Sequence, residues 1–371
     1  MRSIASFRYS AHTSQYFRVL AAVALVAALC GFSSRALAQT RPSSGSAGSA
    51  INLTSIPGTI AYAQPPSGFD PMSASDTELE QYGFPPRPDP ESAPQAYALW
   101  HKLVSTPQTR IANPQLQPTN TYHRPVQDLT PQSEITTSQA SPYTSSNWSG
   151  YTVAASAGTF AVDQAAVYTE YIVPIAQQAA GSCSGSWDYS AQWIGFDGFG
   201  SGDVLQAGSE ANALCAGGNT STQYYGVYEW YPNGAVKILN FKVKPGDVMG
   251  LEVWYTQASP SGHLYFINYT TQKSVTIGFG QPAGTTFYGN SVEWIVERPT
   301  LGSNYATLSH YVAAPFNNTY ALANGMYYYP GSSPAGAIYD ITMVSGSTPI
   351  SIAELYGNST LWFYEVGPAK P

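Results

Sequence analysis

The sequence predicts an all-β fold, a sandwich or a barrel, over residues 141–371. From Tyr143 onward, short runs rich in Val, Ile, Tyr, Trp and Thr alternate with clusters of Gly, Pro, Asn and Ser. Many runs alternate with a period of two, and turn residues recur about every 8 to 15 residues, which is typical of antiparallel strands. Helical periodicity is almost absent there. We expect one compact β domain in this region.

The first 38 residues have the layout of a secretory signal peptide. Three arginines precede an apolar run at 19–32, and the small-residue triplet ALA follows at 36–38. Cleavage is expected after Ala38. A membrane anchor is the alternative, but the run of about 14 residues is shorter than the ~20 that span a bilayer. We expect a secreted protein, extracellular or periplasmic in a Gram-negative host, without a membrane attachment after cleavage.

Residues 39–140 have the composition of loops and linkers, rich in Pro, Ser, Thr and Gln. A helix is predicted at 92–104, with Ser92 as its cap and Pro94 in its first turn. Its apolar stripe consists of Ala96, Leu99, Trp100 and Leu103. We interpret 39–140 as a poorly packed prosegment. A disordered spacer is the alternative.

Two cysteines remain once Cys30 leaves with the signal peptide, namely Cys183 and Cys215. An even number in an oxidising compartment predicts a disulfide, and two free thiols are the alternative. The bond would contribute about 3–4 kcal/mol in the chain-entropy model. Two cysteines without nearby histidines do not form a zinc site, and no metal is expected.

The charge balance excludes a nucleic-acid binder. The formal charge is −7, and loss of the four signal arginines leaves 15 − 4 = 11 basic against 22 acidic residues, or −11. Such a chain lacks the basic surface that nucleic acids require. Only 10% of residues are charged, which suits an acidic medium, because titrating carboxylates drive acid denaturation. Ordinary secreted-protein composition is the other interpretation.

Catalytic motifs based on histidine or a metal are missing after Tyr143. Only His263 and His310 occur there, without a G-x-S-x-G or H-E-x-x-H motif. No pepsin-type Asp-Thr-Gly loop and no phosphate-binding loop is found. Acid–base chemistry in this domain must therefore come from carboxyl groups.

Five glutamates lie inside predicted strands, where most acids would occupy a solvated outer face: Glu170, Glu229, Glu252, Glu293 and Glu297. In the run SVEWIVERPT (291–300), alternation places Glu293 and Glu297 on one face and the apolar residues 292, 294 and 296 on the other. The two carboxyls are about 13 Å apart, too far for a glycosidase pair. Pro299 should end the strand, and Arg298 points away from Glu297.

Five segments occur in a characteristic order: NWSGY (147–151), AQWIGFDG (191–198), VLQAG (204–208), YEWYP (228–232) and VEWIVERP (292–299). Together they resemble the glutamic peptidase (eqolisin) family of acid endopeptidases. The resemblance implies a β-sandwich of two antiparallel sheets, a concanavalin A-like jelly roll, preceded by a signal peptide and a prosegment. It also implies a secreted zymogen that acts on proteins or peptides and needs no cofactor. We expect domains at 1–38, 39–140 and 141–371, and a monomer.

The resemblance implies a catalytic dyad of Gln206 and Glu297, and leaves Glu293 without a role. Glu297 would take a proton from water and pass it to the leaving nitrogen. The Gln206 amide would donate to the oxyanion without titrating. The matching positions Trp193, Asp197 and Glu229 would support substrate or dyad, and Trp148 would form core or cleft wall. Gln192, the other amide nearby, should face the opposite way from Trp193.

Some features depart from the resemblance or leave other readings open. YYG precedes VYEWYP where family members can carry an acid, which puts the supporting network in doubt. A carbohydrate-binding or glycan-hydrolysing sandwich is the main alternative, because aromatic content suits sugar stacking, and a non-catalytic adhesion domain is a third. For a zymogen, we expect protonation of prosegment carboxylates and histidines on acidification to weaken docking.

Overall fold

The computed structural model describes residues 50–132, 140–178 and 183–366 of the chain, which form one compact unit. The predicted signal peptide, the start of the predicted prosegment and the last five residues lie outside the described residues. None of the helices in the described ranges is long and apolar enough to cross a membrane.

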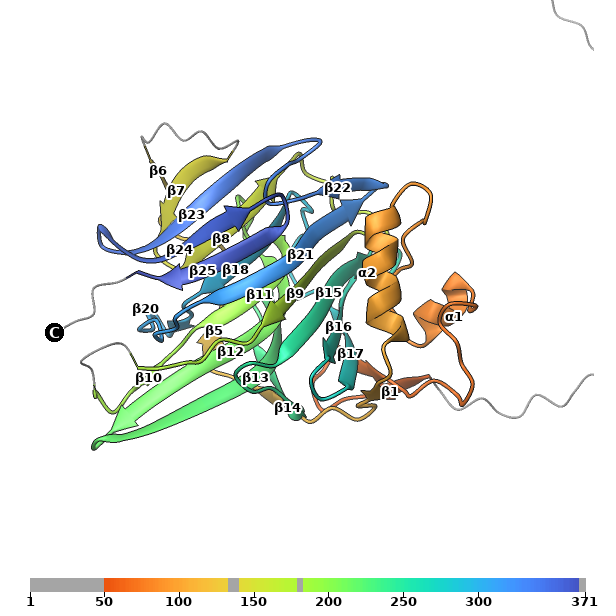
Figure 1. Cartoon of the computed structure of the whole chain (residues 1–371), viewed down its shortest axis with the longest axis horizontal. Helices are drawn as coiled ribbons and strands as arrows, with labels where there is room; N and C mark the ends of the chain where they lie inside the picture. The colour runs from red at the N-terminus through yellow and green to blue at the C-terminus, as the bar shows by residue number, and fades with distance from the viewer. Residues whose placement is uncertain (1–49, 133–139, 179–182, 367–371) are drawn as a thin grey trace, which may run out of the picture. The chain divides into compact units, whose positions relative to one another are not determined.

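Most strands after residue 140 form two sheets, which lie face to face in Figure 1. We call the first the site sheet. From edge to edge its strands are β6 (Thr130–Pro131), β7 (Ser141–Ser145), β23 (Ala337–Ser345), β8 (Trp148–Ala154), β18 (Ser291–Glu297), β11 (Ala191–Asp197), β12 (Val204–Ala216), β13 (Asn219–Tyr231), β14 (Val236–Lys242) and β4 (Leu116–Pro118). The short β10 (Trp187–Asp188) pairs with the far end of β12.

The second sheet, the back sheet, is joined to the first through the hairpin of β23 and β24. Its order is β24 (Thr348–Tyr356), β25 (Thr360–Glu365), β21 (Ala314–Ala323), β9 (Ala166–Ile172), β15 (Val248–Thr256), β16 (Ser261–Asn268), β17 (Lys273–Gly280), β2 (Thr59–Tyr62) and β1 (Ile51–Leu53). At its margins, β22 (Met326–Tyr328) pairs with β21 and β3 (Thr109–Arg110) with β17. Separately, β5 (Thr121–Tyr122), β19 (Thr300–Leu301) and β20 (Asn304–Tyr305) form a three-stranded piece.

This is the predicted β-sandwich of two antiparallel sheets, and the prediction of fold class is confirmed. Pairing is antiparallel except between β7 and β23 and between β3 and β17. The expected strand end at Pro299 is also found, since β18 stops at Glu297. Arg298 donates to the carbonyls of Ser146 and Val344 and makes no contact with Glu297.

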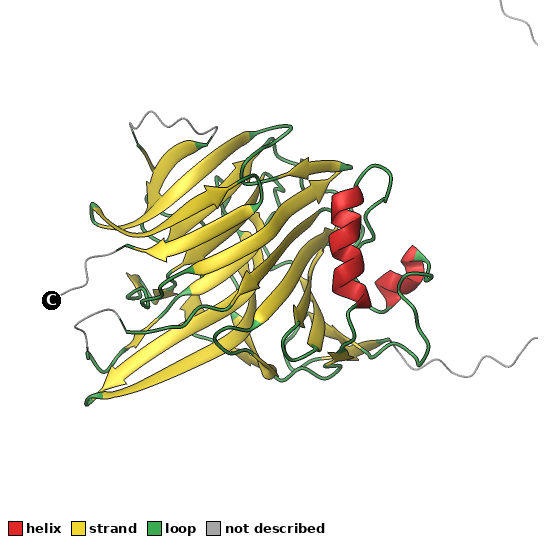
Figure 2. Ribbon diagram, viewed as in Figure 1, coloured by secondary structure: helices red, strands yellow, loops and turns green. Residues whose placement is uncertain are grey.

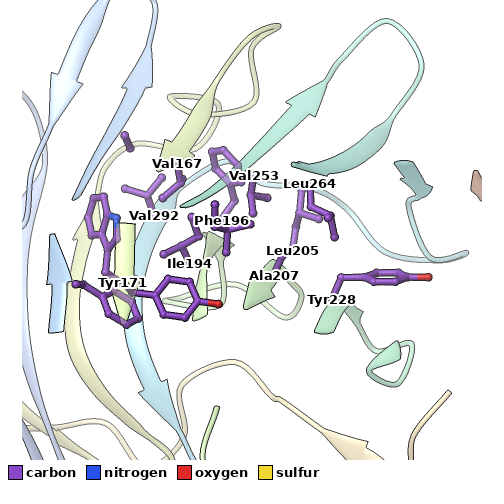
Figure 3. Close-up of a cluster of buried hydrophobic side chains, with 14 of the residues drawn as sticks. Val167, Tyr171, Ile194, Phe196, Leu205, Ala207, Tyr228, Val253, Leu264 and Val292 are labelled. Atoms are coloured by element: carbon purple, nitrogen blue, oxygen red, sulfur yellow. The ribbon is translucent and has the colours of Figure 1, made fainter. Parts of the chain in front are cut away.

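The core between the sheets follows from the period-two pattern. In β18, Val292, Trp294 and Val296 enter the main apolar cluster, while the alternate residues face the other side. Figure 3 shows Ile194, Phe196, Leu205 and Val292 of the site sheet beside Val167, Val253 and Leu264 of the back sheet. Because β-strand side chains alternate between faces, this packing turns the residues between them outward onto a second face of the site sheet, which we call the site face.

The N-terminal part of the described chain is packed, contrary to the expectation of a poorly packed prosegment. Helices α1 (Asp76–Gln81) and α2 (Pro94–Ser105) lie together on one side of the strands (Figure 2). The α2 side chains Ala96, Trp100 and Leu103 are fully buried in a cluster with back-sheet aromatics such as Tyr265. The strands β2, β3 and β4 extend the two sheets. The Pro- and Ser-rich composition concealed this packing, because its contacts are with distant strands.

The predicted helix at 92–104 is present, with a different start. Ala93 is the N-cap residue, and Pro94 occupies the first turn as expected. Ser92 lies one residue too early and donates instead to Asp89 in the preceding turn. The predicted disulfide is confirmed between Cys183 and Cys215, and it ties the loop before β10 to the end of β12.

Candidate active site

The site face carries a row of buried polar groups supplied by four neighbouring strands. Glu297 of β18 stands opposite Trp148 of β8 on one side and Ala191 of β11 on the other. Gln206 of β12 stands opposite Gly195 of β11 and Glu229 of β13. Both glutamates and the glutamine are almost completely buried.

These groups are buried because residues 119–129, which we call the covering segment, lie across the site face. The segment connects β4 to β6 and carries β5. Val126 N donates to Gly198 O over 3.0 Å, and Gln127 N donates to Asn147 Oδ1 over 2.8 Å. The chain's own residues therefore occupy the surface on which the sequence predicted a substrate.

His123 of the covering segment is at the centre of the polar cluster and is fully buried. Its Nδ1 lies 3.4 Å from Glu297 Oε2, and its Nε2 lies 3.4 Å from Glu210 Oε1. Burial alone would lower the pKa of His123, but the nearby Glu297, Glu210 and Glu229 raise it to about 10. The ring is thus an imidazolium, which can donate to a carboxylate at each end.

The backbone of His123 is held as well as its side chain. Gln206 Nε2 donates to the His123 carbonyl over 3.2 Å, and the His123 N–H donates to Glu229 Oε2 over 3.0 Å. Gln206 Oε1 has no hydrogen-bond partner among the described residues. The Gln206 side chain thus binds a peptide carbonyl through its Nε2, and its Oε1 can accept a hydrogen bond from another donor.

Glu297 sits between the covering segment and Asn147. Asn147 Nδ2 donates to Glu297 Oε1 over 3.2 Å and also to the Arg124 carbonyl over 3.1 Å. Burial raises the pKa of Glu297, while the charge of His123 and its hydrogen bonds oppose the rise. A carboxyl with a raised pKa is suited to exchange a proton in the acid range.

Trp193 and Glu229 contact the same histidine. The Trp193 indole Nε1 lies 3.2 Å from His123 Nδ1, and the two rings meet edge to face at 4.7 Å. Because His123 is an imidazolium, this nitrogen carries a proton and cannot accept from the indole, and its 3.4 Å contact with Glu297 Oε2 is an ion pair without hydrogen-bond geometry. Burial raises the pKa of Glu229 well above its usual range.

Asp197 and Trp148 do not contact His123. They make contacts with the loops and strands next to the site. Asp197 accepts from the backbone N–H groups of Tyr288, Gly289 and Asn290 at 2.8–3.0 Å, which fixes the loop that leads into β18. Burial raises its pKa to about 7. Trp148 is fully buried beside Glu297 and packs under Gly198.

Glu293 and Gln192 are where the alternation placed them. Glu293 is fully buried next to Gly195, and neither carboxyl oxygen has a hydrogen-bond partner among the described residues. Burial, Asp197 and Glu297 raise its pKa well above the usual range, which favours the neutral carboxyl. Gln192 turns to the core side, where its Oε1 accepts from Ser209.

Three contact residues were missed in the sequence. His123 and Asn147 meet Glu297 across 174 and 150 positions, and Glu210 meets His123 across 87. Glu210 stands four residues after Gln206 in the same strand, hence on the same face, and this period-two signal was available. For His123, composition gave no signal.

None of the five strand glutamates has the solvated position that is usual for acids in strands. On the back sheet, Glu252 is 1% exposed, and burial raises its pKa to about 8. Glu170 lies beneath α2, where Lys102 Nζ reaches its Oε1 at 2.6 Å. The N-terminal part of the chain covers the outer faces of both sheets. Its composition did not predict this packing.

The fold and this face define a class. A β-sandwich that grips a peptide by its N–H, its carbonyl and one side chain, with carboxyl and amide groups against the peptide bond, has the parts of a carboxyl-dependent peptidase. Residues 146–361 match the sequence profile of the Peptidase A4 family. The chain belongs to this family, and it is therefore a glutamic endopeptidase, which favours the peptidase reading over the carbohydrate one.

Several known proteins are similar to this chain in sequence or in fold. Aspergillopepsin-2 of Aspergillus niger is 28% identical over 229 residues, covering 55% of this chain and 76% of that protein. The structure of scytalido-glutamic peptidase with a transition state analog inhibitor aligns at a TM-score of 0.49 and 20% identity, over 60% of this chain and 98% of that one. Aspergilloglutamic peptidase from Aspergillus niger aligns at 0.41 and 24% identity, over 48% and 99%.

Within residues 50–132, 140–178 and 183–366, no three His, Cys, Asp or Glu side chains are grouped so as to hold a metal ion.

Proposed function

We propose that the protein is an acid endopeptidase whose dyad is Glu297 and Gln206, and that residues 119–129 hold it inactive until acidification. The observation that carries the proposal is the peptide carbonyl of His123 bound by Gln206 while Glu297 contacts the same residue. A substrate peptide would lie where the covering segment now lies.

In the proposed reaction, Glu297 takes a proton from a water molecule, which attacks the scissile carbonyl. Gln206 Nε2 donates to the carbonyl oxygen as negative charge develops on it, because it already donates to a carbonyl at this position. The unpartnered Gln206 Oε1 accepts from the attacking water. Glu297 then returns its proton to the leaving nitrogen. Asn147, which donates to Glu297, keeps the carboxyl in place.

The covering segment supports the zymogen part of the proposal. It shields Glu297 and Gln206 from solvent and provides a peptide bound to both, so no substrate can enter while it is docked. The disulfide between Cys183 and Cys215 fits an oxidising compartment and supports secretion.

Protonation of histidine would strengthen docking, contrary to our expectation for acidification. The pKa of His123 is raised to about 10, so its contribution is complete below about pH 6.5 and lost only as pH rises toward 10. Glu210 has the opposite sign. Burial would raise its pKa, but His123, Lys237 and Asn212 lower it to about 2. Its contribution is present above about pH 4.5 and is lost as pH falls toward 2.

Release in acid is therefore assigned to the pair of Glu210 and His123. Lys237 and Asn212 remain when the segment leaves, so only the His123 part of the Glu210 shift is linked to docking. We expect the activation rate of the purified full chain to rise between about pH 4.5 and pH 2.

The first experiment tests the dyad. The purified full chain is brought to about pH 3 and followed for cleavage within its own N-terminal part and for cleavage of a denatured protein. Glu297→Gln should lower kcat by about 100- to 10,000-fold, the usual share of a general base. Gln206→Ala should lower it by about 100- to 1,000-fold, the usual share of an oxyanion donor. If both variants process and digest like the parent, the dyad is wrong.

The second experiment tests the covering segment. His123→Leu removes both charge contacts with Glu297 and Glu210 and keeps an apolar side chain of similar size. The variant should cleave a small peptide at pH 5 at least about tenfold faster than the unprocessed parent, because a lost buried charge contact weakens docking. His101→Leu, in exposed α2 surface, is the matched control. Equal latency of the His123 variant and parent would contradict autoinhibition by this residue.

A further inference from the structure

Glu210 lies beside the buried side chain of His123, at a position that the dyad chemistry does not use, and we call the space that this side chain fills the His123 pocket. The two oxygens of Glu210 face different ways. Oε1 is 3.4 Å from His123 Nε2 and 3.4 Å from the Thr121 hydroxyl. Oε2 accepts from Asn212 Nδ2 over 2.7 Å and lies 3.5 Å from Lys237 Nζ. The carboxyl is almost completely buried, so Oε1 is a fixed acceptor aimed at whatever side chain occupies the pocket.

The position of His123 shows which side chain that is. Its carbonyl oxygen is the one held by Gln206, so in a substrate the equivalent residue would contribute the scissile carbonyl. The side chain of this residue enters the space between Glu297 and Glu210. This step rests on the function proposed above.

We propose that Glu210 is the specificity-determining residue of this pocket and that it selects substrates with a cationic side chain, above all histidine, on the residue that supplies the scissile carbonyl. Its role is to bind that side chain, and it takes no part in the proton transfers of the dyad.

The shape of the pocket favours an imidazolium. Trp193 meets the His123 ring edge to face at 4.7 Å, so a flat ring fits beside it. The ring spans the two carboxyls, with 3.4 Å contacts at both nitrogens. A neutral side chain of the same size would leave the buried Glu210 without its partner, a cost that makes such sites discriminating.

The charges around Glu210 are consistent with cation binding in acid. Lys237 is drawn toward Oε2 and lies 4.3 Å above the Tyr225 ring, so it does not occupy the position of the substrate cation. The pKa of Tyr225 and of Tyr189 is raised by burial and by Glu210, so both are neutral. Glu229 is protonated in acid because burial raises its pKa.

Glu210 itself keeps its charge where the peptidase is expected to work. When a substrate histidine takes the place of His123, the same contacts hold the pKa of Glu210 below its usual range, so the carboxylate is ionised at pH 3.5, where the substrate histidine is protonated. Both partners of the contact are thus charged in the working range.

The test uses the acid-activated full chain and a set of synthetic peptides that differ only in one residue before the cleaved bond, which is His, Lys, Gln or Leu. Cleavage position is checked by mass spectrometry. At pH 3.5 we expect kcat/KM for the His peptide to exceed that for the Gln peptide by about tenfold or more. In Glu210→Gln, the His/Gln ratio should fall close to one. Glu293→Gln, the same change at a buried position without a contact to His123, should keep the parental ratio.

A measurement on the parent alone covers the case in which Glu210→Gln does not fold. Between pH 3.5 and 7 the His/Gln ratio should fall as the substrate histidine loses its proton, whereas the Lys/Gln ratio should stay above one. A parent that shows no preference for His or Lys at pH 3.5, or a Glu210→Gln variant that keeps the parental ratio, would overturn the inference.

Failure of the inference and failure of the proposed function are distinguishable. If Glu297→Gln is inactive and the parent cleaves all four peptides equally well, the inference about Glu210 is refuted and the proposed dyad is retained. If Glu297→Gln is as active as the parent, the dyad falls whatever the peptide ratios are.

Discussion

The buried carboxyl groups of the site face differ in charge because their partners differ. Glu210 has a cation or an amide at each oxygen, and its pKa is lowered to about 2. Glu293 has no hydrogen-bond partner among the described residues, and its pKa is raised well above the usual range. Glu297 lies between these cases, with Asn147 and His123 as partners. All three carboxyls are buried, so it is the neighbouring groups that make the pKa of Glu297, the proposed base, differ from that of Glu293 in the same strand.

Glu293→Gln should stabilise the protein at neutral pH. The folded-state pKa of Glu293 is raised, so its contribution to stability is present below about pH 4.5 and is lost as pH rises. The amide variant has no such loss. Its advantage should grow by up to about 1.4 kcal/mol per pH unit above pH 4.5. Thermal unfolding at pH 4, 6 and 8 measures this, with the exposed Glu354→Gln as control.

A stability difference that does not change with pH would show that Glu293 is ionised in the folded protein. Because Glu293 does not contact His123, the same variant should retain proteolysis at pH 3, which separates it from Glu297→Gln.

Residue-level prediction from sequence succeeded where the information is local. Alternation along β18 assigned Glu293 and Glu297 to one face and separated them from Val292 and Trp294. It could not give their different partners, since His123 reaches Glu297 across 174 positions of the chain. The roles of Gln206 and Glu297 came from the family resemblance and stay predictions.

At the scale of elements, β11 is fitted to its neighbours by glycine. A Cβ on Gly195 would lie 2.2 Å from the Leu205 carbonyl oxygen and 2.5 Å from Glu293 Oε1. The missing side chain is what lets β12 approach with Gln206 opposite and makes room for the Glu293 carboxyl. Strand β11, which separates Glu297 on β18 from Gln206 on β12, thus has no side chain at position 195.

Gly195→Ala should therefore damage both stability and activity. The clash is with backbone, which cannot rotate away, and overpacking of this kind costs about 1–3 kcal/mol. Displacement of β12 would also move Gln206 from the carbonyl it binds. Urea unfolding and kcat/KM on a peptide measure the two effects. Gly202→Ala has open space around the new Cβ and is the matched control. A Gly195 variant as stable and active as this control would show that the sheet yields at β11.

Elements were predictable where their pattern is contained in a dozen residues. The apolar stripe of α2 and the alternation of β18 are of this kind, and both elements are found. The short strands β1 to β4 were not predicted, because two to four residues carry no periodicity and they exist only by pairing with β14 and β17 or with one another.

On the scale of the whole molecule, the N-terminal part consists of two segments with different contacts. Residues 119–129 cover the site face. Residues 50–118 pack against the back sheet and add strands to both sheets. The second group includes Trp100, fully buried with its indole donating to Pro85 O over 3.0 Å. It also includes Arg110, whose guanidinium lies 4.5 Å from the Phe84 ring centre. Under the proposed function, activation requires only residues 119–129 to leave.

We expect residues 50–118 to stay bound after acid processing. Their release would expose back-sheet aromatics such as Tyr265 and Trp254 and would leave the edges of β14 and β17 unpaired. After cleavage between residues 119 and 140, the N-terminal fragment should co-elute with the β-sandwich on gel filtration at pH 3 and separate only in denaturant. Trp100→Ala should weaken this association by about 3–5 kcal/mol, the usual cost of truncating a buried tryptophan. Leu53→Ala, at a side chain that is 89% exposed, is the control. Elution of the sandwich alone, still active and without the fragment, would show that residues 50–118 are a removable prosegment after all.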